Sequence, residues 1–188
     1  TRNGGGVYIG NGDFISDNSV IISYNNASID GGGVFVKAEA DEVILSGKFV
    51  GNTAKEEGGA IYVNHSQITK VKESKFYGNI ARTYGGAIYL ESNVSISLED
   101  SINMSGNTPN SLYLTNANNL SNIILDENSL IGIDTSFDTS IDNPLRVGVG
   151  NLSYFSSNKF GYELEETSFN GIYFKKQEVT SVPNSYIV

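Results

Sequence analysis

A single spacing limits what this chain can fold into: a double-glycine motif followed by strand-forming residues recurs at a constant interval. The motif begins at positions 4, 31, 58 and 85 of the 188-residue chain, which gives a 27-residue period. A second landmark, the triplet Asn-x-Ala, begins at positions 25, 52 and 79 and therefore keeps the same interval. Two independent landmarks with one shared period are the sequence signature of a solenoid, in which each repeat stacks on the next.

The residues between the landmarks favour strands over helices. They form short runs of β-branched and aromatic side chains, such as residues 94–98, and lack the 3.6-residue periodicity of an amphipathic helix. At ~3.3 Å per residue, one repeat has room for three short strands and their turns, and each coil can pair with the next about 4.8 Å away. We therefore expect an all-β fold, a right-handed parallel β-helix (solenoid) with 27-residue rungs.

Stacking in register predicts columns of like residues along the solenoid. Side chains alternate between the two faces of a strand, so aliphatic residues two positions apart share one face, which we assign to the core. The asparagines of the second landmark are expected to hydrogen-bond to one another through their side-chain amides. The predicted core columns are Val7, Val34, Ile61 and Ile88, and Ile9, Val36, Val63 and Leu90. The predicted amide ladder consists of Asn25, Asn52, Asn79 and Asn107.

An aromatic column runs between the two aliphatic columns, and alternation places it on the opposite face of the strands. If this face is the outside of the solenoid, the rings form a platform on which sugars or an extended partner could bind. Two alternatives stay open: the rings stabilise the sheet by stacking across strands, or a flanking loop covers them. The candidate binding residues are Tyr8, Phe35, Tyr62, Tyr89 and Tyr113.

The repeat weakens after residue 90, where Asn107 is followed by a corner shortened by four residues. Residues 123–125 and 130–131 are expected to supply further strands, and residues 145–149 a last one. The chain thus predicts four clear rungs followed by one or two degenerate ones.

The C-terminal segment is rich in aromatic residues and predicts a β-hairpin, with strands at 161–165 and 171–175 joined by residues 166–170. A solenoid must cover its terminal edges, so we interpret this hairpin as a cap. We divide the chain into rungs over 1–141 and capping strands over 142–188. Because the first rung starts within a turn, we expect further rungs upstream of it in the native protein.

Composition argues against several partners. The net charge is −9, and neither nucleic acid nor an anionic membrane attracts such a surface. The sequence has no cysteine and no run of about 18 apolar residues, so it predicts neither a thiolate metal site nor direct membrane insertion.

The sequence contains few of the residue patterns that form catalytic sites. Polysaccharide lyases and glycoside hydrolases also use β-helices, but they need clustered carboxylates. Asp30 and Glu57 occupy equivalent positions before the double glycine, yet Tyr84 ends that column, so we interpret them as solvated turn carboxylates rather than a weak cation site. The single histidine, His65, gives no basis for a catalytic triad. We predict no catalytic residue, metal or cofactor; a polysaccharide-cleaving enzyme on the same scaffold is the alternative.

The motifs at Phe49–Asn52 and Gly58–Ile61, and their equivalents at Phe76–Asn79 and Gly85–Ile88, resemble the repeats of the chlamydial polymorphic outer-membrane proteins. Similar repeats occur in adhesin-like surface proteins of other bacteria and archaea. The resemblance implies a β-helical passenger of the autotransporter kind, part of a larger chain, exported to the cell surface and often acting in adhesion. It implies a host glycan or protein receptor as partner. A non-adhesive spacer within a larger surface protein is the other alternative.

Overall fold

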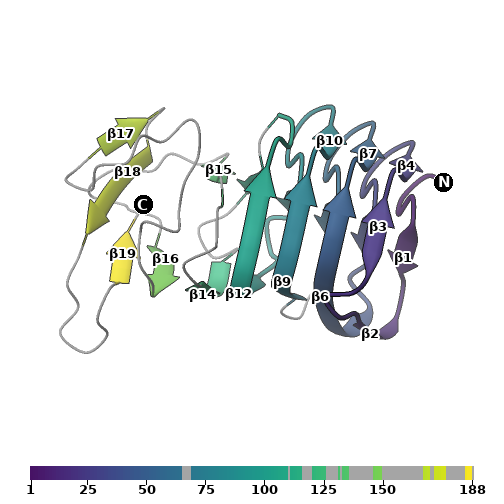
Figure 1. Cartoon of the computed structure of the whole chain (residues 1–188), viewed down its shortest axis with the longest axis horizontal. Coiled ribbons are helices and arrows are strands. Elements are labelled where there is room, and N and C mark those ends of the chain that lie inside the picture. The colour runs from purple at the N-terminus through teal and green to yellow at the C-terminus, as the bar shows by residue number, and fades with distance from the viewer. Residues whose placement is uncertain are drawn as a thin grey trace.

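The computed structural model confirms a parallel β-helix (Figure 1). Every described element is a strand, and the described residues include no helix long and apolar enough to span a membrane. The structure describes residues 1–64, 69–109, 111–115, 120–125, 131, 133–135, 146–149, 167–169, 172–176 and 185–187.

Three parallel sheets build the solenoid, and each of the first three rungs contributes to all of them. In the first sheet, every strand pairs in register with its equivalent one rung away; Val34 is opposite Ile61, which in turn is opposite Ile88. The repeat period therefore becomes the hydrogen-bonding register of the sheet. The strands of this sheet, in spatial order, are β1 (Val7–Ile9), β5 (Val34–Val36), β8 (Ile61–Val63), β11 (Ile88–Leu90), β13 (Leu112–Leu114) and β15 (Ile133–Thr135).

The second sheet contains the longest strands, which stand side by side in the foreground of Figure 1. Bulges interrupt the register between neighbouring long strands, and Glu73 and Asp100 adopt positive φ angles of 44° and 62° there. A bulge bends its strand, which lets one long strand follow two sides of the coil. The strands are β2 (Gly12–Ile15), β3 (Ile21–Ser23), β6 (Ala40–Val50), β9 (Thr69–Tyr77), β12 (Ile96–Ser105) and β14 (Leu120–Leu125).

The first rung has two strands, β2 and β3, where later rungs have one. Between them Asp17 forms a local turn, accepting hydrogen bonds from the Ser19 backbone at 2.8 Å and from the Ser19 hydroxyl. Aspartate favours such turns because its side chain satisfies the backbone two residues on. The third sheet is short and consists of β4 (Asn26–Ala27), β7 (Thr53–Ala54) and β10 (Ile80–Ala81).

The core lies inside the coil, and both predicted aliphatic columns point into it. Their members in the second to fourth rungs are fully buried, as are Leu112 and Leu114 in the next. Phe49 and Phe76 stack with ring centroids 4.7 Å apart, so the apolar position of the second landmark also forms a core column.

The double glycine is required by close backbone approach. Gly58 has a φ of +66°, which favours glycine, and a Cβ there would lie 2.4 Å from the carbonyl oxygen of Ile61. A Cβ on Gly59 would lie 2.3 Å from the carbonyl oxygen of Gly86 in the neighbouring rung. The first glycine thus makes the turn, and the second lets the rungs stack at this corner.

The asparagines form a continuous amide ladder. Asn52 Nδ2 donates to Asn79 Oδ1 at 3.0 Å and to the carbonyl oxygen of Ile22 at 2.8 Å. Its Oδ1 accepts from the backbone N–H and the Nδ2 of Asn25 at 3.1 and 3.0 Å. Asn79 repeats this pattern with Asn107, so each amide joins three successive rungs. All four hydrogen-bonding positions of the Asn52 amide are satisfied, which explains how a polar side chain can be fully buried.

Beyond residue 115 the outcomes are mixed. The strand predicted at 123–125 is present within β14, whereas Ile131 is not in a strand and β15 begins two residues later. The register reflects the shortened corner: Ile88 is opposite Leu112, three positions earlier than a full repeat would place its partner. The degenerate rungs therefore stay parallel although their length changes.

The C-terminal segments form an antiparallel sheet with the order β16 (Arg146–Val149), β19 (Ser185–Ile187), β18 (Ile172–Lys176), β17 (Thr167–Phe169). A hairpin-type antiparallel pair is present, but its first strand is β17, in the segment predicted to be the connection. The strand predicted at 161–165 lies outside the described residues. So does the predicted boundary between 1–141 and 142–188, and that division stays a prediction.

Candidate functional site

The five predicted aromatic residues form one continuous stack on the outer side of the first sheet. Neighbouring ring centroids lie 5.4, 5.0, 5.1 and 5.8 Å apart, with interplanar angles of 3° to 18°. Each ring lies next to the equivalent ring of the neighbouring rung because their strands pair in register. The stack consists of Tyr8, Phe35, Tyr62, Tyr89 and Tyr113.

The exposure of this column, which the sequence left open, is limited to one of its five members. Only Tyr8, which has a single ring neighbour in the stack, is open to solvent, at 52% of its surface. Tyr62 is 6% exposed, and Phe35, Tyr89 and Tyr113 are similarly buried. The faces of the inner rings are covered by the rings above and below, so a sugar cannot stack on them.

Side chains from the two ends of each strand cover the ring edges. The Tyr62 hydroxyl donates to Glu91, which follows the strand of the next rung, and the Tyr89 hydroxyl donates to Glu57, at the double-glycine corner of the rung before. Tyr84, at the equivalent corner one rung after Glu57, stacks on Tyr113 with centroids 4.3 Å apart. The alternative of a covered, sheet-stabilising column therefore describes these rings.

The covering carboxylates form an acidic seam, defined here as Asp30, Glu57 and Glu91. Burial, reinforced by the charge of Asp30, raises the pKa of Glu57 to about 6. Burial likewise raises the pKa of Asp30, although a hydrogen bond from the Glu57 backbone opposes this. Burial and the hydrogen bond to Glu91 raise the pKa of Tyr62 above its ordinary value. Asp30 and Glu57 are thus partly desolvated, and Glu57 loses its proton at a higher pH than an exposed glutamate does because its pKa is raised.

The seam has a structural explanation. Asp30 Oδ1 accepts the backbone N–H of Glu57 at 3.1 Å, so the first carboxylate fastens the corner of the next rung. Within the part of the chain that the structure describes, no three His, Cys, Asp or Glu side chains are grouped so as to hold a metal ion. His65 lies outside the described residues.

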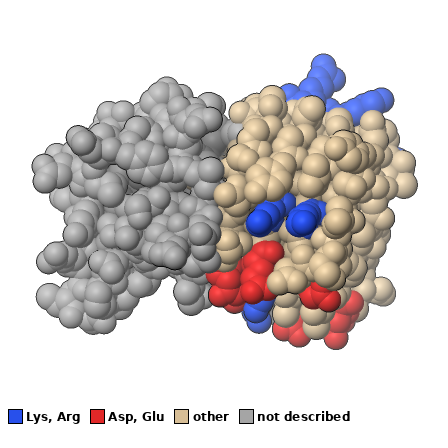
Figure 2. Space-filling model, viewed as in Figure 1, with Lys and Arg blue, Asp and Glu red and all other residues tan. Residues whose placement is uncertain are grey.

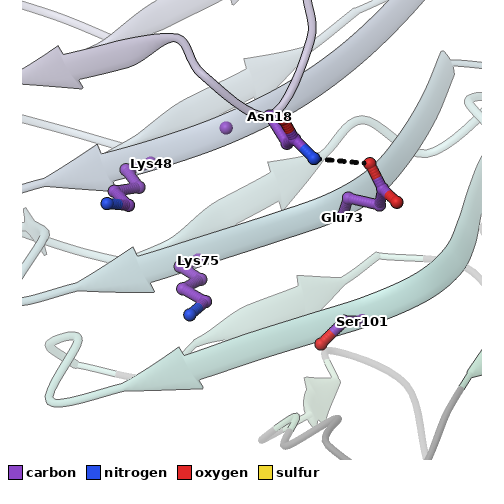
Figure 3. A pocket seen from close by; sticks show the side chains of 6 residues that line it. Asn18, Lys48, Glu73, Lys75 and Ser101 are labelled. Carbon is purple, nitrogen blue, oxygen red and sulfur yellow. Dashed lines mark hydrogen bonds between the residues drawn. The ribbon is translucent and has the colours of Figure 1, made fainter.

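A second surface, on the long-strand sheet, was not anticipated from the sequence. A hollow of about 310 Å³ lies over the bulges of β6, β9 and β12. Figure 3 shows Lys48 and Lys75 on adjacent strands at one end of it, with Asn18 hydrogen-bonded to Glu73 at the other. The lining residues are Asn18, Gly47, Lys48, Glu73, Lys75 and Ser101.

The sequence did contain a signal for this surface. Lys48 and Lys75 are one repeat apart and each immediately precedes a core phenylalanine, so they form a basic column. The signal was thus a column of lysines rather than of carboxylates. The bulge that shapes the hollow has no comparable signal, since Glu73 and Asp100 are ordinary-looking residues with left-handed backbone conformations.

Comparison with known families finds one similarity. Two segments of the chain, residues 46–64 and 73–91, match the Chlamydia polymorphic membrane protein repeat. Each matched segment contains a core phenylalanine, a ladder asparagine, the double-glycine corner and a stacked tyrosine. No curated protein and no solved structure matches the chain significantly. The repeat and the solenoid together fit a β-helical module of a surface protein.

Proposed function

We propose that this chain is an adhesin module of a bacterial or archaeal cell surface. The observation that supports it best is the pair of polymorphic membrane protein repeats, each of which builds a complete corner of the β-helix. A β-helix is a stiff rod whose rungs are held by backbone pairing, ladders and core columns, and such a rod presents its outer face at a distance from its anchor.

The outer face of the long-strand sheet is the surface we assign to contact with other cells. It is broad, hollowed, and carries exposed side chains of mixed chemistry, whereas the aromatic face is closed by its own stacking. Strands β6, β9 and β12 supply most of this surface.

The proposal is tested in two steps. Antibodies raised against the purified chain should label intact cells of the source organism, and brief proteolysis of those cells should remove the signal. Purified fluorescent chain should then bind host epithelial cells or neighbouring bacteria saturably, with unlabelled chain competing.

Three outcomes separate the alternatives. Surface labelling with saturable cell binding supports an adhesin. Surface labelling without cell binding in any of these assays indicates a spacer instead. Release of unsaturated or reducing sugars from pectin, alginate or glycosaminoglycans by the purified chain would overturn the non-enzymatic interpretation.

A further inference from the structure

The basic column on the long-strand sheet is unusual for a protein with a net charge of −9. Lys48 and Lys75 are directly opposite each other on parallel strands, where like charges destabilise the pairing. Among the described residues neither forms an ion pair, although Lys37 pairs with Glu39 at 3.1 Å and Lys70 with Glu42 at 3.6 Å. The two lysines therefore concentrate uncompensated positive charge at one place on an acidic molecule.

The face that carries the long strands is largely uncharged. Figure 2, which shows the same side as Figure 1, has two neighbouring basic side chains within this surface and a group of acidic side chains directly below them. Asn103 continues the column one rung further, opposite Lys75, and Ser101 contributes a hydroxyl to the hollow. Amide and hydroxyl groups of this kind hydrogen-bond to neutral polar ligands as well as to anions.

The one carboxylate that lines the hollow is engaged. Glu73 Oε2 accepts a hydrogen bond from Asn18 Nδ2 at 3.0 Å, at the end away from the lysines. Its negative charge nevertheless opposes an anion in the hollow. Removing that charge should therefore raise the affinity for an anion, whereas removing the lysines should lower it.

An exposed aromatic ring lies beside the same face. Tyr24 is 80% exposed and takes the left-handed position, with φ of 54°, that glycine holds at equivalent places in the next three rungs. Its ring lies against Gly51, where a Cβ would be 2.6 Å from the ring carbon Cε1. Beyond it a Cβ on Gly78 would meet nothing within 4 Å, so the track past the ring is open.

The two features run parallel along the solenoid. Ile21, Lys48, Lys75 and Asn103 form one outward column, and Tyr24, Gly51, Gly78 and Gly106 form the turn column beside it. An extended ligand lying along the axis would meet charges spaced by about 4.8 Å on one side and an aromatic ring on the other.

On the assumption that the proposed adhesive function is correct, we propose that this face binds an acidic polysaccharide, its carboxylate or sulfate groups placed at Lys48 and Lys75 and a sugar ring placed on Tyr24. Two lysines supply charge for one or two anionic groups, which suits a polymer with one anion per repeating unit. A polynucleotide carries a denser charge, which the overall acidity of the chain repels. A peptide adding as a strand needs an unpaired sheet edge, and this face is the flat of a sheet whose strands already pair on both sides.

The test measures binding of the whole chain to hyaluronate oligosaccharides and to oligogalacturonate by calorimetry, with neutral dextran and poly-glutamate as controls. The double substitution Lys48→Gln/Lys75→Gln should weaken binding of the preferred acidic glycan at least about tenfold, the effect of losing one charge-assisted hydrogen bond or more. The matched control is Lys37→Gln/Lys70→Gln, which removes the same charge from residues outside the hollow and should change binding by less than about twofold.

Two further variants sharpen the result. Glu73→Gln should tighten binding about threefold by removing the opposing charge. Tyr24→Ser should weaken binding without changing the melting temperature of the chain, because Tyr24 is exposed. The proposal is overturned if neither acidic glycan binds, if the control double variant loses as much affinity as the Lys48/Lys75 variant, or if poly-glutamate binds as well as the glycans.

Cell binding separates this proposal from the adhesive function. If the Lys48/Lys75 double variant adheres to cells as well as the unaltered chain, adhesion stands and the glycan site as its basis is overturned. If acidic glycan binds at this face and no cell type is bound, the site stands and the adhesive function fails.

Discussion

Replacing Asn52 with alanine tests whether the amide ladder stabilises the solenoid. The substitution removes four hydrogen bonds, two donated by Nδ2 and two accepted by Oδ1, at a side chain that is fully buried. A net value of about 1 kcal/mol for each bond, reduced because the half-buried Asn25 can regain water, gives a loss of about 3 kcal/mol. In a chain of this size that loss corresponds to a fall of roughly 6–12 °C in melting temperature.

The same substitution at Asn25 is the matched control. Asn25 is half-buried and only donates to the ladder, through its N–H and Nδ2, so Asn25→Ala should cost about 1 kcal/mol or less. Asn52→Asp should be at least as damaging as Asn52→Ala, because a carboxylate would face the oxygen acceptors of Asn79 and Ile22.

Urea unfolding followed by circular dichroism and by tyrosine fluorescence measures these differences. Both probes are needed because solenoids can unfold rung by rung, and only coincident transitions permit a single free energy. If Asn52→Ala costs no more than Asn25→Ala, the buried ladder contributes nothing beyond its neighbours and the reasoning is refuted.

Three other expectations concern the corner, the core and the seam. Gly59→Ala should prevent correct stacking, because its Cβ would meet the backbone of the next rung at 2.3 Å, whereas Gly10→Ala, which meets only a movable side chain at 3.2 Å, should fold normally; the amount of soluble, protease-resistant protein distinguishes them. Phe76→Ala should lower the free energy of unfolding by about 3–5 kcal/mol by emptying the core column, and an effect under about 1 kcal/mol in urea would contradict the stacked core. The pKa of Glu57 is raised from 4.5 to about 6, so its ionisation destabilises the fold as pH rises through that interval. Glu57→Gln should therefore stabilise the chain at pH 7, by at most about 1 kcal/mol for this partly exposed group, and should have little effect at pH 4; equal effects at both pH values would show that its charge is not responsible.

The fold could be predicted because the repeat reports contacts between rungs directly. Residues one repeat apart in the sequence, such as Val34, Ile61 and Ile88, are opposite one another in the sheet. One interval therefore predicted the register of the strands, the residues of the core columns and the asparagines that pair in the amide ladder. Where the interval changes, prediction became less accurate: Ile131 lies outside the strand expected for it, and β17 occupies the expected connection.

The site could be predicted only in part. Alternation places Tyr62 on the outer side of its strand, but it does not say that neighbouring rings and Glu91 cover it there. Exposure depends on side chains that reach across from the corners, and nothing in the period determines their reach. The hollow beside Lys48 depends on bulges between the long strands, whose left-handed residues leave no trace in composition.

The amide ladder also has consequences for how such a chain can change in length. Asn52 accepts from the asparagine of the rung before it and donates to that of the rung after it, and Asn79 does the same. Successive rungs therefore present the same donors on one side and the same acceptors on the other. One such rung can follow another without loss of a bond, provided that the inserted or deleted segment is a whole repeat. Duplication or loss of one repeat would lengthen or shorten the rod by about 4.8 Å, and the contacts between the remaining rungs would be kept. Because of the ladder, the length of the rod can change in equal steps when whole repeats are gained or lost.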